Sequence, residues 1–148
     1  MPTPVNYSTN AMGSYLGMAA PIDVNGVIPN IAYYPRIVAK TASYTVLRTE
    51  SGTYFTTTGA TAAINFTLPA ISTGPWIFEF FNGADQNLTV TSGTADTIVT
   101  FNDLTADSVA FSTSAEKIGG HIIAFTDGTT LFVVAHPSMV NQHVTIAT

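Results

Sequence analysis

The feature that most constrains this chain is a strand–turn rhythm that begins near residue 43 and continues to its end. Short runs rich in Thr, Val, Ile and Phe alternate between apolar and polar residues with a period of two, as in 64–68 and 109–111. Turn dipeptides separate these runs: Ser51-Gly52, Asn82-Gly83, Ser92-Gly93 and Asp127-Gly128. No segment after residue 40 has a helical period, and residues 103–107 are expected to form one helical turn at most.

The predicted strands lie at residues 43–49, 53–58, 62–68, 75–81, 87–91, 96–101, 108–112, 118–126, 129–136 and 143–147. Short strands at this spacing are typical of antiparallel sandwiches and barrels. We therefore predict an all-β fold, an antiparallel, jelly-roll-like β-sandwich or barrel domain over residues 41–148. A two-residue hairpin turn at Asp127-Gly128 would place His121 opposite Val134, with His136 diagonal to His121 on the same sheet face.

The first forty residues have a different composition, with prolines at positions 2, 4, 21, 29 and 35. Proline removes backbone donors and fixes φ, so no long helix or central strand fits here. The segment is nevertheless too apolar for a disordered linker. An extended arm on another surface accounts for both facts, and a coil wrapped on its own domain is the alternative. Residues 1–40 are predicted to be an extended arm whose candidate partner contacts are Tyr7, Tyr15, Leu16, Met18, Ile22, Ile28, Ile31, Tyr33, Tyr34 and Arg36.

Charge is scarce along the whole chain. Of 148 residues only 9% are charged, against about 25% in typical soluble domains, which predicts that much of the surface is buried in a partner or an oligomer. A net charge of −5 with only Arg36, Lys40, Arg48 and Lys117 as cations argues against binding nucleic acid or an anionic membrane. The absence of cysteine excludes disulfides and thiolate chemistry. No apolar run reaches the ~20 residues of a membrane span, and no signal peptide is recognised.

The run WIFEFF at residues 76–81 is apolar on both faces, which predicts a strand covered on both sides. One face carries Trp76, Phe78 and Phe80, and the other carries Ile77, Glu79 and Phe81. Glu79 has two readings, a hydrogen-bonded outward strand residue or the acid of a small β-fold hydrolase. No nucleotide-binding loop or nucleophile elbow accompanies it. We therefore expect no enzymatic activity and no cofactor.

Two further groups of side chains have alternative readings as ligand sites. His121 and His136 are either polar residues at a sheet end or, with one histidine per chain around a trimer axis, a ring suited to a metal or an anion. Asp103 and Asp107 either belong to a hydrated turn or supply oxygen ligands to Ca²⁺, but their spacing matches no complete loop motif. The structural reading is preferred for both groups, so no metal site is predicted.

An ordered series of segments carries a family resemblance. It runs from YTVLRTESGTYFTTTGATAAINFTLPA through WIFEFFN, NLTV and DTIV to TDGTTLFVV, and covers about residues 43–136. The series resembles the small β domains of tailed-bacteriophage virion proteins, which include capsid decoration (cement) proteins, head fibres and tail-fibre modules. In that pattern a Ser-Gly turn opens a strand, a Leu-Pro step ends one, and an Asp-Gly hairpin precedes the last aromatic strand. Leu131-Phe132 stand where the pattern usually has Trp-Tyr-like aromatics.

The resemblance implies a non-enzymatic structural protein, commonly trimeric, on the exterior of a virion and in the host cytoplasm during assembly. The leading hypothesis is a homotrimeric decoration protein. It would bind the major capsid protein or another virion protein and stabilise the capsid by bridging capsomers, with the arm as its anchor. The alternative is a tail-fibre or head-fibre module that binds a host-surface receptor or glycan through exposed aromatics such as Tyr7, Tyr15, Tyr33, Tyr34, Tyr44 or Tyr54.

Overall fold

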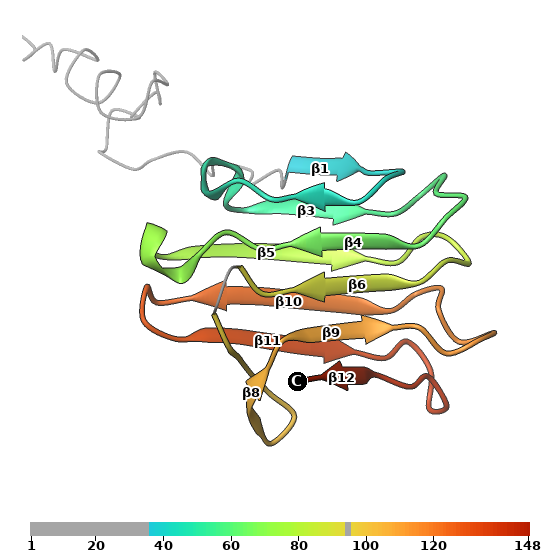
Figure 1. The fold of residues 1–148 in the computed structure, drawn as a ribbon. Coiled ribbons are helices and arrows are strands. Elements are labelled where there is room, and N and C mark those ends of the chain that lie inside the picture. The colour runs from blue at the N-terminus through green and yellow to red at the C-terminus, as the bar shows by residue number, and fades with distance from the viewer. Residues whose placement is uncertain (1–35, 94–95) are drawn as a thin grey trace, which may run out of the picture. The chain divides into compact units, whose positions relative to one another are not determined.

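The protein's fold is given by a computed structural model that describes residues 36–93 and 96–148 (Figure 1). No helix in these two ranges is long and apolar enough to cross a membrane. The strands and the two 3₁₀ turns follow one another in this order: β1 (Arg36–Ala39), β2 (Tyr44–Thr45), η1 (Arg48–Glu50), β3 (Thr53–Thr56), β4 (Ile64–Thr67), η2 (Ile71–Thr73), β5 (Trp76–Phe81), β6 (Leu88–Thr91), β7 (Ile98–Thr100), β8 (Asp103–Ala106), β9 (Ser108–Phe111), β10 (His121–Thr126), β11 (Leu131–His136) and β12 (Thr145–Ala147).

The strands form two sheets that pack as a β-sandwich, which confirms the predicted all-β class. The first sheet has seven strands in the order β1-β3-β5-β10-β11-β7-β8, and the second has five in the order β12-β9-β6-β4-β2. Aromatic rings from both sheets meet between the layers. Phe66 of β4 lies 4.8 Å, centroid to centroid, from Phe80 of β5 and 5.5 Å from Phe55 of β3. All three rings are fully buried, so the alternation read from the sequence does place one face of each strand in a common core.

Strand direction is where the predicted antiparallel pairing is wrong. β1, β3 and β5 are parallel neighbours in one sheet, and β2, β4 and β6 are parallel neighbours in the other. From β1 to β6 the chain alternates between the sheets, so each strand returns to its own sheet in the direction of the one before (Figure 1). Antiparallel pairs begin only with β8 and β9. Both sheets of the sandwich therefore contain parallel and antiparallel strand pairs. The parallel pairs formed by β1 to β6 lie where consecutive strands belong to opposite sheets.

Several local predictions also need correction. Residues 103–106, expected to form at most a helical turn, are strand β8, which pairs with β7 through a two-residue loop at Phe101-Asn102. Asn82-Gly83 is not a hairpin turn, because the chain passes from β5 in one sheet to β6 in the other. Residues 36–39, placed in the predicted arm, form the edge strand β1, parallel to β3. The rest of the arm, residues 1–35, lies outside the described residues.

Candidate functional site

The two outward sides of the sandwich differ in chemistry, and the outer side of the seven-stranded sheet is the unusual one. On β5, β10 and β11 the side chains opposite the core include six large apolar residues, which we call the apolar face: Ile77, Phe81, Ile123, Phe125, Phe132 and Val134. Of these, Ile77 is 47% exposed, Val134 41% and Phe125 37%. The rings of Phe125 and Phe132 stack with their centroids 5.2 Å apart. Contiguous exposed apolar surface of this kind marks interaction sites more often than scattered residues do.

The outer side of the five-stranded sheet is polar and carries no charged strand residue. We call it the threonine face: Thr45, Asn65, Thr67, Thr89, Thr91, Ser108 and Thr145. Its side chains bond to one another, as when the Thr91 hydroxyl donates to Asn65 Oδ1 at 2.7 Å. In both sheets the alternating pattern therefore places apolar side chains in the core. Only the seven-stranded sheet also has large apolar side chains on its outer side.

A group of polar and aromatic side chains, the histidine cluster, lies within the apolar face: Tyr54, Glu79, His121 and His136. His121 Nε2 is hydrogen-bonded to Glu79 Oε2 at 3.0 Å. Tyr54 of β3 and His136 of β11 both stack on the His121 ring, with centroids 5.6 Å and 5.7 Å away. Glu79 is an outward, hydrogen-bonded residue, in agreement with the first of its two readings. The bond satisfies a carboxylate that would otherwise sit unpaired among apolar neighbours.

Register explains why the two histidines touch. His121 and His136 are direct cross-strand partners, and not diagonal ones as predicted. The reason is the loop, since Thr126 pairs with Leu131 and leaves four residues in the turn. Asp127 Oδ1 accepts hydrogen bonds from the backbone N–H groups of Thr129 and Thr130, at 2.7 and 2.8 Å, which closes the longer loop. The resulting shift of two residues keeps every side chain on its predicted face but changes its partner.

In the histidine cluster the charged side chain, Glu79, has a hydrogen-bond partner in His121. Burial and the nearby Glu79 carboxylate raise the pKa of Tyr54 above its ordinary value, so the phenol is neutral near pH 7. Glu79 and His121 together form an acid–imidazole pair, and aromatic rings occupy both sides of that imidazole. Within residues 36–93 and 96–148 no three His, Cys, Asp or Glu side chains are grouped so as to hold a metal ion. The arrangement orients the Glu79–His121 pair on an apolar surface.

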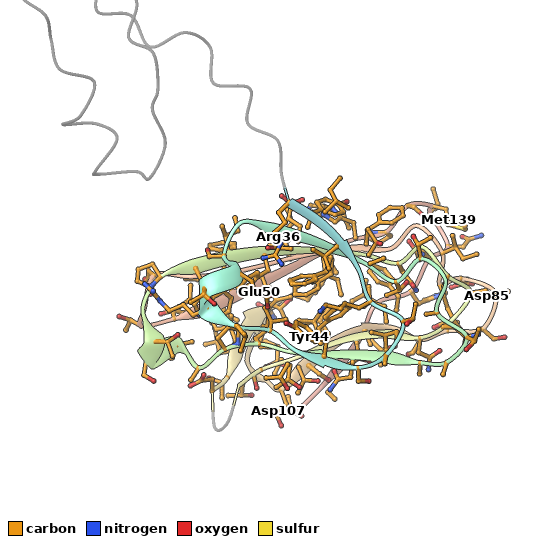
Figure 2. All side chains as sticks on the ribbon, turned by 90° about the horizontal axis from the view of Figure 1, so that it is seen from above. Arg36, Tyr44, Glu50, Asp85, Asp107 and Met139 are labelled. Carbon is orange, nitrogen blue, oxygen red and sulfur yellow. The ribbon has the colours of Figure 1, made fainter. Side chains whose placement is uncertain are left out.

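A second polar group closes the edge of the sandwich between β1 and β2. Glu50 accepts a hydrogen bond from the Tyr44 hydroxyl at 3.0 Å, and its other oxygen lies 3.9 Å from Arg36 Nη2. Figure 2 looks onto this edge, where Arg36, Glu50 and Tyr44 are labelled. The ammonium of Lys40 lies over the Tyr44 ring, 3.2 Å from its centroid. The bond to Glu50 raises the pKa of Tyr44. Arg36 and Lys40 thus have partners within the chain.

The remaining predicted residues are not brought together. Asp103 Oδ1 accepts a hydrogen bond from Thr105 N at 2.8 Å, a local turn contact, while Asp107 follows the far end of β8. His143 bonds to Glu116, whereas His121 and His136 stack on each other. Arg36 is the single predicted partner contact within the described residues, and the others, from Tyr7 to Tyr34, lie outside them. The Glu79–His121 pair was missed by sequence reasoning, because nothing local says that β5 pairs with β10.

No protein-family model matches this chain, and no curated protein matches it in sequence.

Proposed function

We propose that this chain is a structural virion protein, a decoration protein that binds the outside of a bacteriophage capsid and stabilises it by bridging capsomers as a homotrimer. The observation that carries the proposal is a β-sandwich with a large apolar face that no other described residue covers. Together with the ordered motifs of residues 43–136 and the low charge, it supports a protein that works by surface association without catalysis. Its partner would be the major capsid protein or another virion protein.

Deletion of the arm tests whether it anchors the protein to the capsid. Deleting residues 1–35 stops just before β1, so both sheets keep all their strands. We expect the truncated chain to retain the circular dichroism spectrum of a β protein but to lose binding to undecorated capsids in a co-sedimentation assay. The full-length chain, added to the same capsids, is the control. Normal decoration by the truncated chain would remove the anchoring role from the arm.

One observation favours a second function, a tail-fibre or head-fibre module that binds a receptor or glycan. The Phe125–Phe132 ring pair at the surface is a suitable platform for a sugar ring. Tyr44 and Tyr54 are less suitable, because Lys40 and His121 already contact their rings. Copy number per virion separates the two functions, since hundreds of copies fit decoration and a few tens fit a fibre. Binding on a glycan array would favour the fibre module.

A further inference from the structure

The apolar face lacks any covering element within the described residues, although it has the composition of a second core layer. Its central strand, β10, carries Ile123 and Phe125 outward, while Ile122 and Ala124 on the same strand are fully buried against the other sheet. β10 is also flanked on both sides, by β5 and β11. We propose that the apolar face is covered by the same face of other copies of this chain. The inference rests on the self-association in the proposed function and assigns the surface that makes it.

Charge favours a second copy over a charged partner. None of the four Lys and Arg residues lies on the apolar face, and Glu79 is already paired with His121. Burying the face would therefore bury a hydrogen-bonded carboxylate and not an unpaired one. A strongly acidic or basic partner would find no unpaired counter-charge here. An identical face carries a single carboxylate, Glu79, so like-charge repulsion between two faces is limited to that residue.

The placement of the acid and the second histidine selects the direction of the symmetry axis. Glu79 lies on β5 and His136 on β11, on opposite sides of β10. An axis parallel to the strands lays the β5 side of one copy against the β11 side of the next. Glu79 shares its row across the sheet with Val134, and His136 lies in the next row on the same side of the sheet, so Glu79 would lie opposite the neighbour's Val134 and diagonal to its His136. An axis across the strands would instead bring Glu79 toward its own equivalent, a repulsive pair. The parallel axis suits three copies around a prism as well as two copies face to face.

The size of the sheet's outer side sets the area such a contact can bury. The apolar face covers three strands of six residues, and β3 and β1 continue the same side of the sheet with four residues each. At about 4.8 Å between strands and about 3.3 Å per residue, the flat footprint is about 300 Å² for the apolar face and about 400 Å² with β3 and β1. That is within the range of apolar patches that monomers expose, roughly 300–600 Å². In a trimer each copy contacts two neighbours, so the ~800 Å² per partner of a standard interface would include surface beyond the apolar face.

The test places one negative charge on each outer side of the sandwich in the full-length chain. Val134→Glu puts a carboxylate in the apolar face, in the row of Glu79, and Thr89→Glu puts one at a central strand position of the threonine face. Molar mass is measured by size-exclusion chromatography with light scattering. We expect a trimer for the wild type and for Thr89→Glu. For Val134→Glu we expect a subunit dissociation constant raised about tenfold or more, because the new carboxylate would be buried opposite the neighbour's Glu79. The single tryptophan, Trp76, is buried, so an unchanged emission spectrum shows that each variant is folded.

The outcomes separate the parts of the proposal. A wild-type monomer overturns both this inference and the homotrimer. Capsid binding would then still be tested separately by the deletion of residues 1–35. A folded Val134→Glu that stays fully associated overturns the face alone. Loss of capsid binding by that variant, with its assembly intact, would mean that another virion protein covers the face. A wild-type dimer that Val134→Glu dissociates supports the face and overturns the three-fold arrangement.

His136 tests the axis direction. His136→Glu would place an acid beside the neighbour's Glu79, whereas His136→Gln is uncharged. We expect the Glu variant to weaken association at least several-fold more than the Gln variant. Equal effects of the two substitutions would overturn the strand-parallel axis.

Discussion

Asn82 is the residue on which three loops converge. Its side chain is fully buried, and its Oδ1 accepts a hydrogen bond from the Thr57 hydroxyl at 2.6 Å. Its Nδ2 donates to the carbonyls of Gln86 and Lys117, each at 2.9 Å. The Thr57 hydroxyl in turn accepts from Gly83 N. A fully satisfied buried network of this kind fixes the loops relative to one another, where the sequence had indicated only a surface turn.

Replacing Asn82 with Ala should lower the free energy of unfolding by about 2–4 kcal/mol, because it removes three side-chain hydrogen bonds from a buried position. Chemical denaturation followed by Trp76 fluorescence measures the change. Asn141→Ala, at an exposed position in a turn, is the matched control and should change stability little. If the two variants unfold at the same denaturant concentration, the network does not stabilise the fold.

Asp127 is expected to make the stability of the β10–β11 hairpin sensitive to acid. Hydrogen bonds from Thr130 and Thr129 hold the pKa of its carboxyl below the ordinary value of 3.8. The ionised group therefore stabilises the folded chain above about pH 3.8. This contribution is lost as the pH falls below that value and through the lower pKa of the folded state.

Asn is the informative replacement for Asp127, because its side-chain oxygen can still accept the two turn bonds but does not titrate. We expect Asp127→Asn to make the free energy of unfolding less dependent on pH in urea titrations from about pH 5 to about pH 2. Asp127→Ala should be destabilised across the whole range, since it loses the bonds themselves. A wild-type acid slope retained by Asp127→Asn would contradict the assignment.

At the scale of single elements, the β7–β8 hairpin contains two of the three described non-glycine residues with positive φ. Its two loop residues, Phe101 and Asn102, have φ values of 40° and 65°. Two consecutive positive φ angles are those of a type I′ turn, which favours Asn-Gly. Phe is poorly suited to this region of φ and is also 53% exposed here.

The double variant Phe101→Asn/Asn102→Gly should therefore raise the unfolding free energy by about 0.5–1.5 kcal/mol. Differential scanning calorimetry would show it as a higher melting temperature. The same pair of residues at two loop positions that lack positive φ, Thr61→Asn/Ala62→Gly, gives a control that should not stabilise. No gain at the β7–β8 loop would mean that Phe101 makes compensating contacts.

Elements also show what sequence can and cannot predict here. The position of β5 and the faces of its residues were predicted correctly, because alternation is local and the run 76–81 has no competing signal. Its neighbours were not predicted, because pairing with β10 and parallel alignment with β3 depend on which sheet the chain enters next. β8 was missed because DLTA lacks apolar alternation, and its strand form depends on pairing with β7. The Glu79–His121 contact was out of reach for the same nonlocal reason.

At the scale of the whole molecule, self-association through the apolar face should make stability depend on protein concentration. Subunits that associate only when folded shift the equilibrium toward the folded state by mass action. A hundredfold increase in concentration should raise the melting temperature of the wild type by roughly 3–8 °C. The melting temperature of Val134→Glu should depend less on concentration, because its association is weaker. A wild-type melting temperature that does not vary would count against association in solution.

The pairing of β5 with β10 also affects how the chain is made. β5 ends at Phe81 and β10 begins at His121, so one backbone edge of the most apolar strand has no partner until the later strand is synthesised. At ribosomal rates of about 5–20 residues per second, roughly forty residues take about 2–8 s. For that time each nascent chain offers an open strand edge that another nascent chain can pair with. The yield of soluble protein should therefore fall as the rate of expression rises, and slower synthesis at lower temperature should restore it.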